Sequence, residues 1–341
     1  MKTNLKKLFK YIQQEHELIA PIKKDRGVFL SQVKDLNKIE LPVQLTENSF
    51  KDFLFPQEQE LFDFKGNELI EPQQYTAPKL ALFGISIIDL RALTLYHQVF
   101  RHDPYYQARL NNTVVIGYLK VTAPDQTFGI FQERLEEDTL EHLEFDIFVL
   151  DSNIGLHFFS GSNKGQNILT QAGIDSYENV EYVGPIKESG LDQTMVANYQ
   201  KVKKSFKTHR KLWKELGKRC LACGKCSLAC PTCFCFSTHY KFGQKKRTGK
   251  KVLSWDTCFY SEFSRVAGGH KFLDTIAKRI YFWYEHKFVR IPDEFSIPGC
   301  VGCGRCIKVC PVAIDLSKVL AELGKPTKKT APRKTLKKKK S

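Results

Sequence analysis

The feature that most constrains this chain is a run of four cysteines that occurs twice. CLACGKCSLACP occupies residues 220–231 and CVGCGRCIKVCP occupies residues 300–311, and both have the form Cys-x2-Cys-x2-Cys-x3-Cys-Pro. Each iron corner of a 4Fe–4S cluster takes one thiolate, so two-residue spacers let one tight turn present three sulfurs, while the fourth must come from elsewhere. The two runs therefore predict two 4Fe–4S clusters.

The same spacing predicts which cysteines bind which cluster. In two-cluster ferredoxins, the fourth cysteine of each run serves the cluster of the other run. Applied here, the first set is Cys220, Cys223, Cys226 and Cys310, and the second set is Cys300, Cys303, Cys306 and Cys230. Structural zinc prefers pairs of ligands separated by a long loop, so the spacing favours iron over zinc.

Three cysteines lie outside these sets: Cys233 and Cys235 in CPTCFCF, and Cys258 in SWDTCFY. Two interpretations stay open for them. They could be buried thiols packed beside aromatic neighbours, or a further redox or metal site next to the clusters, as in a thiol–disulfide reductase. Three thiolates are one short of a cubane set, so a third 4Fe–4S cluster made from them alone is not expected.

Among the scattered histidines, His270 ranks first as a group that could hydrogen-bond a cluster sulfur. It follows a pair of glycines that interrupts the helical pattern in the cysteine-rich part of the chain. The alternative, and the commoner case for a histidine, is a surface or packing role. No arrangement of catalytic Ser, His or paired carboxylates can be argued from spacing.

The distribution of the cysteines indicates the compartment. All eleven lie between Cys220 and Cys310, whereas disulfides of a secreted protein would be spread along the chain. The N-terminal sequence MKTNLKKLFKYIQQEHELIA turns polar too soon for a secretory signal, and no apolar run is long enough for a transmembrane helix. We therefore expect a cytoplasmic protein without a membrane span.

The net charge of +16 is concentrated at the C-terminal end. Residues 325–341 carry nine Lys or Arg and no acidic residue. Such a block predicts a disordered basic tail over residues 323–341, either a solubilising arm or a loose attachment to an acidic partner. Because no aromatic residue is interleaved with the charges, nucleic-acid binding is not expected.

The apolar pattern predicts an α+β fold in two parts. Residues 1–195 contain helical spacing at 86–100 and strand patterns at 112–121 and 145–161, which predict a mixed α/β domain without cysteines. Strand patterns are scarce from residue 196 on. Residues 196–322 are therefore predicted to form an all-α, helical ferredoxin-type domain that holds the clusters.

Several motifs outside the cysteine runs point to one family. They are KDFLFPQEQELFDF (51–64), LFGISIIDLRAL (82–93), DPYYQAR (103–109), CPTCFCF (230–236) and SWDTCFYSEFSRVAGGH (254–270). With them, the chain resembles the iron–sulfur subunit shared by sulfhydrogenases, as their beta subunit, and anaerobic sulfite reductases, as their A subunit. The resemblance covers most of the chain.

This resemblance implies a non-catalytic electron-transfer subunit with a helical dicluster domain. It implies one partner subunit that binds flavin and a nicotinamide cofactor, and a second partner that is a hydrogenase or a sulfite reductase. The chain itself has no GxGxxG or Walker sequence, so phosphate-binding residues are expected in another subunit.

The chain departs from the family at one group of positions. Family members commonly have cysteines where this chain has Ile88, Val121, Phe128 and Ile130, and those cysteines could bind an additional cluster. Apolar residues at these positions predict a filled core instead. The resemblance therefore carries over two clusters and not a third.

Overall fold

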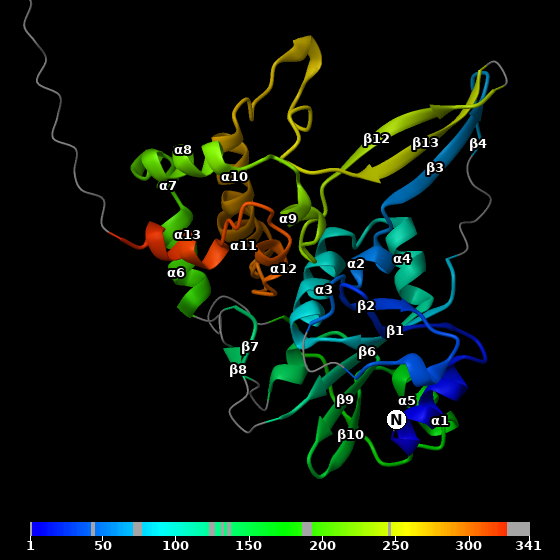
Figure 1. Cartoon of the computed structure of the whole chain (residues 1–341). Helices are drawn as coiled ribbons and strands as arrows, with labels where there is room; N and C mark the ends of the chain where they lie inside the picture. The colour runs from blue at the N-terminus through cyan, green and yellow to red at the C-terminus, as the bar shows by residue number, and fades with distance from the viewer. Residues whose placement is uncertain are drawn as a thin grey trace, which may run out of the picture.

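The structure, a computed structural model, describes residues 2–41, 45–70, 77–122, 127–130, 133–134, 138–185, 193–244 and 247–325. Its first part is built around a seven-stranded sheet, and its second part is a group of helices that lies beside this sheet (Figure 1). A smaller four-stranded sheet projects from the junction between the two parts. Both cysteine runs lie close to this junction, at α9 and α12.

The large sheet is mixed, with the strand order β11-β10-β9-β6-β5-β1-β2. Neighbours among β1, β5, β6 and β9 pair in parallel, whereas β2 and β10 are antiparallel to β1 and β9. The strands are β1 (Glu17–Lys24), β2 (Gly27–Gln32), β5 (Leu80–Ile85), β6 (Thr113–Lys120), β9 (Ile147–Ser152), β10 (Gly155–Ser160) and β11 (Glu178–Asn179). The all-apolar strand β5 is buried along its whole length, as expected for a strand covered on both faces.

Helices cover both faces of the large sheet, and alternate residues of β5 belong to different cores. Ala81 and Phe83 pack with α1 and α5, whereas Leu80 and Leu82 pack with α3 and α4. These helices are α1 (Thr3–Ile12), α3 (Ile87–Val99), α4 (Pro104–Asn111) and α5 (Asn163–Gln171). The C-terminal end of β5 leads directly into α3, which faces the cysteine runs.

Local sequence patterns in this part are confirmed. The helix predicted over 86–100 is α3, and the Ser86 side chain caps it by accepting a hydrogen bond from the Asp89 backbone N–H. The strand predicted over 112–121 is β6, and the pair predicted within 145–161 is the antiparallel hairpin β9–β10. In each case the pattern and the element that it forms lie within the same short stretch.

The small sheet has the strand order β12-β13-β3-β4 and is antiparallel throughout. Its strands are β3 (Glu58–Lys65), β4 (Glu68–Ile70), β12 (Phe236–Phe242) and β13 (Thr248–Trp255). The Trp255 indole N–H, at the end of β13, donates to the Phe55 carbonyl at 2.9 Å. The sheet thus joins the two parts of the chain by main-chain hydrogen bonds.

The prediction of an all-α C-terminal domain is wrong, because β12 and β13 lie within residues 196–322. Period-two alternation of Phe236, Thr238, Tyr240 and Phe242 is present in the sequence, but the interspersed polar and basic residues obscure it. The ladder also needs β3, which lies far away in the chain, so no local pattern could reveal it. The fold combines a seven-stranded mixed sheet, a second sheet and a mainly helical C-terminal part.

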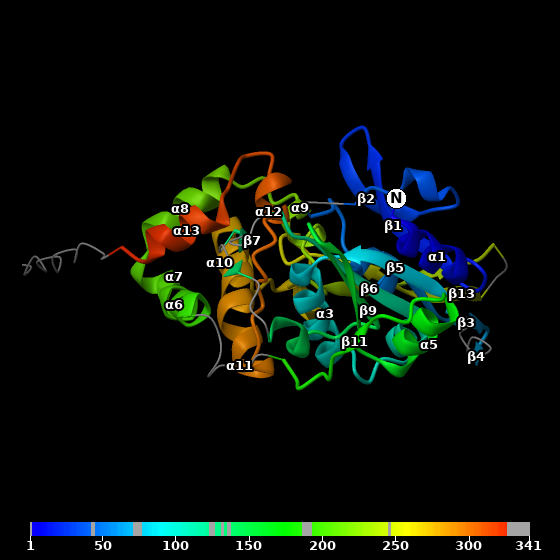
Figure 2. The same ribbon diagram turned by 90° about the horizontal axis from the view of Figure 1, so that it is seen from below.

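The helical part packs around the cysteines. Figure 2 shows α6, α7, α8, α10 and α13 gathered at one side of the large sheet. The helices are α6 (Gln193–Val202), α7 (Ser205–Thr208), α8 (Arg210–Arg219), α9 (Lys225–Leu228), α10 (Ile276–Glu285), the π-helical turn η4 (His286–Arg290), α11 (Ile291–Phe295), α12 (Arg305–Lys308) and α13 (Leu316–Leu323). Trp213, Ile280, Trp283 and Tyr284 form its core together with the cysteines.

Short elements complete the described structure: α2 (Lys51–Leu54), β7 (Thr127–Phe128), β8 (Glu133–Arg134) and the 3-10 turns η1 (Leu36–Lys38), η2 (Thr139–His142) and η3 (Ala267–Gly269). Within the described ranges, every helix is too short or too polar to cross a membrane. The basic tail predicted over 323–341 lies outside the described residues from position 326 on.

Candidate iron–sulfur centre

The two cysteine runs fold in the same way. In each run a glycine in the left-handed region, Gly224 with φ 73° and Gly304 with φ 74°, precedes a single short helix, α9 or α12. Two residues earlier, Ala222 and Gly302 also have positive φ. At Gly224 a Cβ atom would lie 2.5 Å from a methyl carbon of Thr257, so glycine is required there for space as well as for φ.

The cysteines of the first predicted set line one cavity. Cys220, Cys223 and Cys226 reach it from the first run, and Cys310 reaches it from the second, together with Cys306 of the second predicted set. Its walls also include the apolar side chains Phe259, Ile280, Trp283, Tyr284 and Leu316. Five cysteines therefore line the cavity. A 4Fe–4S cluster requires four sulfur donors in apolar surroundings, so these residues fit the group.

Backbone N–H groups also point at these sulfurs. The Ala222 N–H donates to Cys220 Sγ at 3.3 Å, and the Ile314 N–H donates to Cys310 Sγ at 3.2 Å. Burial, followed by the neighbouring thiols, raises the pKa of Cys226 to about 12. The raised pKa means that the Cys226 thiol loses its proton when it binds a metal cluster, which couples cluster binding to proton release.

The second predicted set gathers next to the first. Burial and then the nearby Cys230 raise the pKa of Cys303 to about 12, and burial, Cys300 and Cys230 raise the pKa of Cys306. Cys230, which belongs to the first run, is thus a neighbour of the second. A 4Fe–4S cluster takes one thiolate at each iron, so its ligands need not converge on one point. Across the described ranges, no three His, Cys, Asp or Glu side chains lie close enough together to bind one single metal ion.

A buried lysine, Lys287, contacts Cys230. Its Nζ lies 3.1 Å from Cys230 Sγ, 2.9 Å from Thr232 Oγ1 and 3.4 Å from the Gly299 carbonyl, and its side chain is only 2% exposed. Burial alone would lower the pKa of Lys287, but the Cys230 and Cys233 sulfurs raise it above its usual value. The lysine sits on the π-helical turn η4, an element often found at functional sites.

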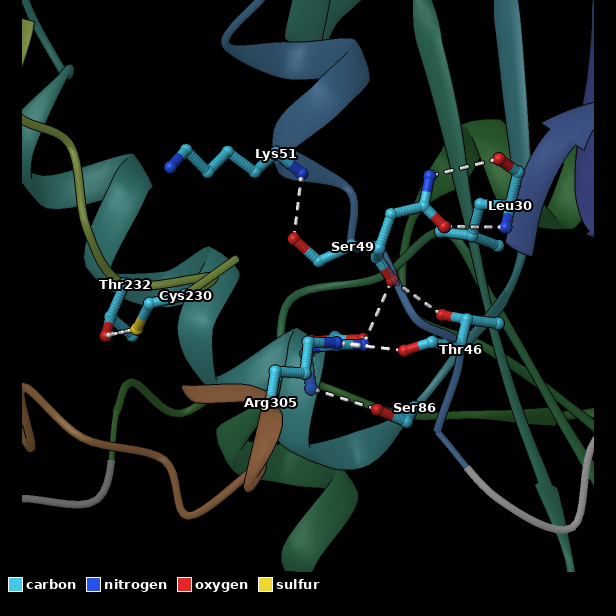
Figure 3. A network of polar contacts seen from close by, with 10 residues as sticks. Leu30, Thr46, Ser49, Lys51, Ser86, Cys230, Thr232 and Arg305 are labelled. Carbon is cyan, nitrogen blue, oxygen red and sulfur yellow. Dashed lines mark hydrogen bonds and ion pairs between the residues drawn. The ribbon is translucent and has the colours of Figure 1, made fainter. Parts of the chain in front are cut away.

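These donors favour the thiolate form of Cys230. A hydrogen bond from the Cys233 thiol, then Lys287 and Thr232, hold the pKa of Cys230 well below its usual value against the opposing effect of burial. Figure 3 shows Thr232 beside Cys230. Sequence reasoning missed Lys287, although a lysine within the aromatic stretch YFWYEHKF is a signal of a buried cation.

Arg305 fixes the second run to the first part of the chain. Its Nη1 and Nη2 lie 2.6 and 2.7 Å from the two Asp89 carboxylate oxygens, and the side chains are 4% and 2% exposed. Its remaining donors reach the Thr46 carbonyl at 2.9 Å and the Asn48 carbonyl at 3.1 Å (Figure 3). These four hydrogen bonds hold α12 against α3 and the 46–48 segment, and sequence reasoning also missed this pair.

Of the four positions where the resemblance implied cysteines, Ile88 and Ile130 lie close to the second run. Ile88 is buried in the core that includes Val301 and contacts Cys303, which confirms the apolar packing predicted there. The Ile130 N–H donates to the Gly302 carbonyl at 2.7 Å. Val121 is half-buried, and the Phe128 side chain lies outside the described residues. At Ile88, core packing therefore occupies the place of a ligand.

The remaining predicted residues divide into two places. Cys233 and Cys258 are buried in the core of the helical part, and Cys235 lies next to Cys258. His270 is exposed, and its ring meets the Phe272 ring edge to face at 5.0 Å between centroids. A role for His270 toward a cluster stays a prediction.

Comparison with known proteins agrees with this geometry. Residues 219–314 match the model of the 4Fe-4S dicluster domain family. The chain is 26% identical over 333 residues to "Sulfhydrogenase 2 subunit beta" of Pyrococcus furiosus, covering 92% of this chain and 94% of that protein. No solved structure matches the chain. The predicted resemblance is confirmed: the chain is an iron–sulfur electron-transfer protein similar to a sulfhydrogenase beta subunit, with a dicluster domain that implies two 4Fe–4S clusters.

Proposed function

We propose that the chain is the electron-transfer subunit of an oxidoreductase complex. It passes electrons between a subunit that binds flavin and a nicotinamide cofactor and a catalytic subunit of the hydrogenase or sulfite reductase type. The observation that carries this proposal is the cavity lined by cysteines of both runs. The name of the similar protein favours the hydrogenase-type partner.

The crossed ligand sets are part of the proposal. Cys310 shares a cavity with Cys220, Cys223 and Cys226, which supports the first set, and Cys306 of the second set lines the same cavity. Cys230 lies close enough to Cys303 and Cys306 to raise the pKa of both, which supports the second set. When bound, each cluster accepts and donates one electron. The protein supplies sulfur ligands, excludes water with apolar walls and places the Lys287 ammonium as a counter-charge beside the second set.

The two sets differ in their access to solvent. Cys223 is exposed, and Leu221 beside it is 63% exposed. Val301, Cys303 and Arg305 of the second run lie instead against the first part of the chain. Because electron transfer between proteins requires a cluster near the surface, we place the exchange with a partner at the surface around the exposed Leu221 and Cys223.

We assign a separate role to each part of the chain, using the domain boundaries predicted from the sequence. We propose that residues 1–195 form a docking and supporting domain, that residues 196–322 carry the clusters, and that 323–341 is a separate basic tail. The projecting sheet formed by β3, β4, β12 and β13 connects the two sides of the first boundary through main-chain hydrogen bonds between strands.

The proposed function predicts the composition of the native complex. Anaerobic purification, with iron and acid-labile sulfide counted, should give roughly eight irons per chain, two cubanes' worth. Co-purifying subunits should include a flavoprotein and a hydrogenase or sulfite reductase. Near twelve irons would reveal a third cluster, and zinc with little iron, or clusters that dithionite cannot reduce, would contradict the proposal.

The exchange surface predicts a selective kinetic defect. Leu221→Glu should slow electron exchange with the partner about tenfold. The change places a charge in an apolar contact whose contribution to docking is a few kcal/mol at most. Iron content and the EPR spectrum should stay unchanged. Ile154→Glu is the matched control, since Ile154 is 87% exposed at the distant β9–β10 turn. Equal slowing by both variants would place the contact elsewhere.

A further inference from the structure

The projecting sheet has two faces of different chemical character. Successive residues of a strand point to opposite faces of its sheet. Tyr240 and Phe242 of β12 therefore share one face, and Lys241 between them lies on the other, where it forms an ion pair with Glu58 of β3. The charged face balances its own charges in this way. The opposite face is aromatic, and water alone gives no reason for it.

Three aromatic rings from two strands meet on this face. The centroid of the Phe64 ring lies 5.8 Å from that of Tyr240 and 6.1 Å from that of Phe242, edge to face in both cases. Gly249 of β13 separates them in the ladder, and a Cβ atom there would lie 2.6 Å from the Phe64 ring. Glycine thus lets Phe64 lie across the middle strand. Leu69 of β4 pairs with Phe64, and these four apolar residues form what we call the aromatic face.

The aromatic face is open to solvent. Tyr240 is 52% exposed, Leu69 69% and Phe242 79%. Figure 1 shows the sheet projecting away from the large sheet and from the helical part. Large apolar side chains that are exposed together mark interaction sites, and aromatic residues are enriched where proteins meet. We therefore interpret this face as a contact surface.

The charges beside the aromatic face are positive. Residues 236–255 carry six Lys or Arg and no acidic residue. Lys251 shares the face with Tyr240, and its Nζ lies 4.1 Å from the centroid of the Tyr240 ring. Arg247 lies in the turn at the end of the sheet, where its carbonyl accepts a hydrogen bond from the Gly66 N–H at 2.7 Å. A complementary surface is therefore apolar at its centre and acidic at its edge.

Two other occupants fit this face less well. In a twofold contact between two copies of the chain, the same cations would meet one another and repel. Bases of a nucleic acid stack on open ring faces. Lys251 covers one face of the Tyr240 ring, and Phe64 contacts both Tyr240 and Phe242 edge to face. These contacts favour an acidic protein surface over both.

We propose that the aromatic face docks an acidic protein subunit of the same oxidoreductase complex, through a contact that is apolar at its centre and bordered by Asp or Glu of the partner. The inference rests on the proposed function, which requires partner subunits. Leu221, where we place the electron exchange, lies between α8 and α9, away from the end of the projecting sheet (Figure 1). The sheet therefore holds a subunit in place without taking part in the exchange.

A photo-crosslinker tests the contact in the native complex, purified anaerobically. Phe242→p-benzoylphenylalanine should form a covalent link to a second subunit on irradiation. Mass spectrometry of the linked peptides should identify that subunit and find Asp or Glu beside the linked residue. The matched control is Ile154→p-benzoylphenylalanine, since Ile154 is exposed at the distant β9–β10 turn. This control should form no link.

Substitutions measure how much the face contributes to docking. Phe242→Asp and Leu69→Asp should each raise the dissociation constant of the linked subunit about tenfold or more, because each places a carboxylate in the apolar centre of the contact. Lys251→Glu should also weaken docking and reduce its salt dependence. Ile154→Asp should leave the dissociation constant unchanged. Native mass spectrometry of the diluted complex measures the constant, and iron content and circular dichroism should stay the same in all four variants.

The contrary outcomes separate this proposal from the proposed function. A link from position 242 to a second copy of the chain or to nucleic acid would overturn the docking surface. So would the absence of any link, or an unchanged dissociation constant for Phe242→Asp, in a complex that keeps its partner subunits and reducible clusters, and the proposed function would then stand. A complex that forms the link but whose clusters dithionite cannot reduce would contradict the proposed function and keep the docking surface.

Discussion

Replacing Arg305 with methionine is expected to lower the free energy of unfolding by about 3–5 kcal/mol, because it leaves the buried Asp89 carboxylate without its partner. Both side chains are nearly inaccessible to solvent, and the guanidinium makes four hydrogen bonds to Asp89, Thr46 and Asn48. Water cannot replace these bonds without opening the junction between α12 and α3. Anaerobic urea denaturation, followed by tryptophan fluorescence, measures the loss.

Two controls separate this pair from ordinary charge effects. Arg265→Met removes a solvent-exposed ion pair with Glu262 and should leave the free energy of unfolding nearly unchanged. The double variant Arg305→Met with Asp89→Leu should recover much of the loss, because no unpaired charge remains buried. A double variant that loses as much as the two single variants together would show that the two side chains act independently.

Replacing Cys310 with alanine is expected to remove one cluster and leave the other, lowering the iron content from roughly eight to roughly four per chain. The crossed arrangement makes a sharper prediction for pairs of substitutions. Cys310→Ala with Cys220→Ala should lose no more iron than either change alone, because both remove ligands of the same cluster. Cys310→Ala with Cys300→Ala should lose both clusters.

An uncrossed arrangement gives the opposite pattern. If each run bound its own cluster, Cys310→Ala with Cys300→Ala would lose one cluster, and Cys310→Ala with Cys220→Ala would lose two. Iron analysis with EPR spin quantitation distinguishes these results. Far-UV circular dichroism of each variant reports whether the helical part has unfolded, since cluster binding is coupled to folding.

The sequence predicts those parts of the structure that depend on neighbours in the chain. The spacing within each run places its turn and short helix, and Ser86 marks the start of α3. The strands β6, β9 and β10 follow their own apolar patterns. These features could be predicted because the residues that cause them lie within one element or one loop.

What the sequence does not reveal depends on distant partners. In the sequence, Arg305 resembles a surface residue of a cysteine loop. In the fold it forms a buried ion pair with Asp89, which is 216 positions away. Lys287 becomes a counter-charge only because the fold brings Cys230, 57 positions away, to its Nζ. Strand β13 acquires its second neighbour, β3, from the other part of the chain. The ligand sets, the domain boundaries and the basic tail stay predictions.

The pairing of β3 with β13 also determines when the small sheet can form during synthesis of the chain. Lys250 of β13 and Glu60 of β3, which form an ion pair across the sheet, are 190 residues apart. At a translation rate of about 5–20 residues per second, roughly 10–40 seconds pass between the synthesis of β3 and the synthesis of its partner strand β13. During this time the edge of β3 that will pair with β13 is open to other strands. The small sheet therefore closes late in translation, when the first cysteine run has been made and the second has not.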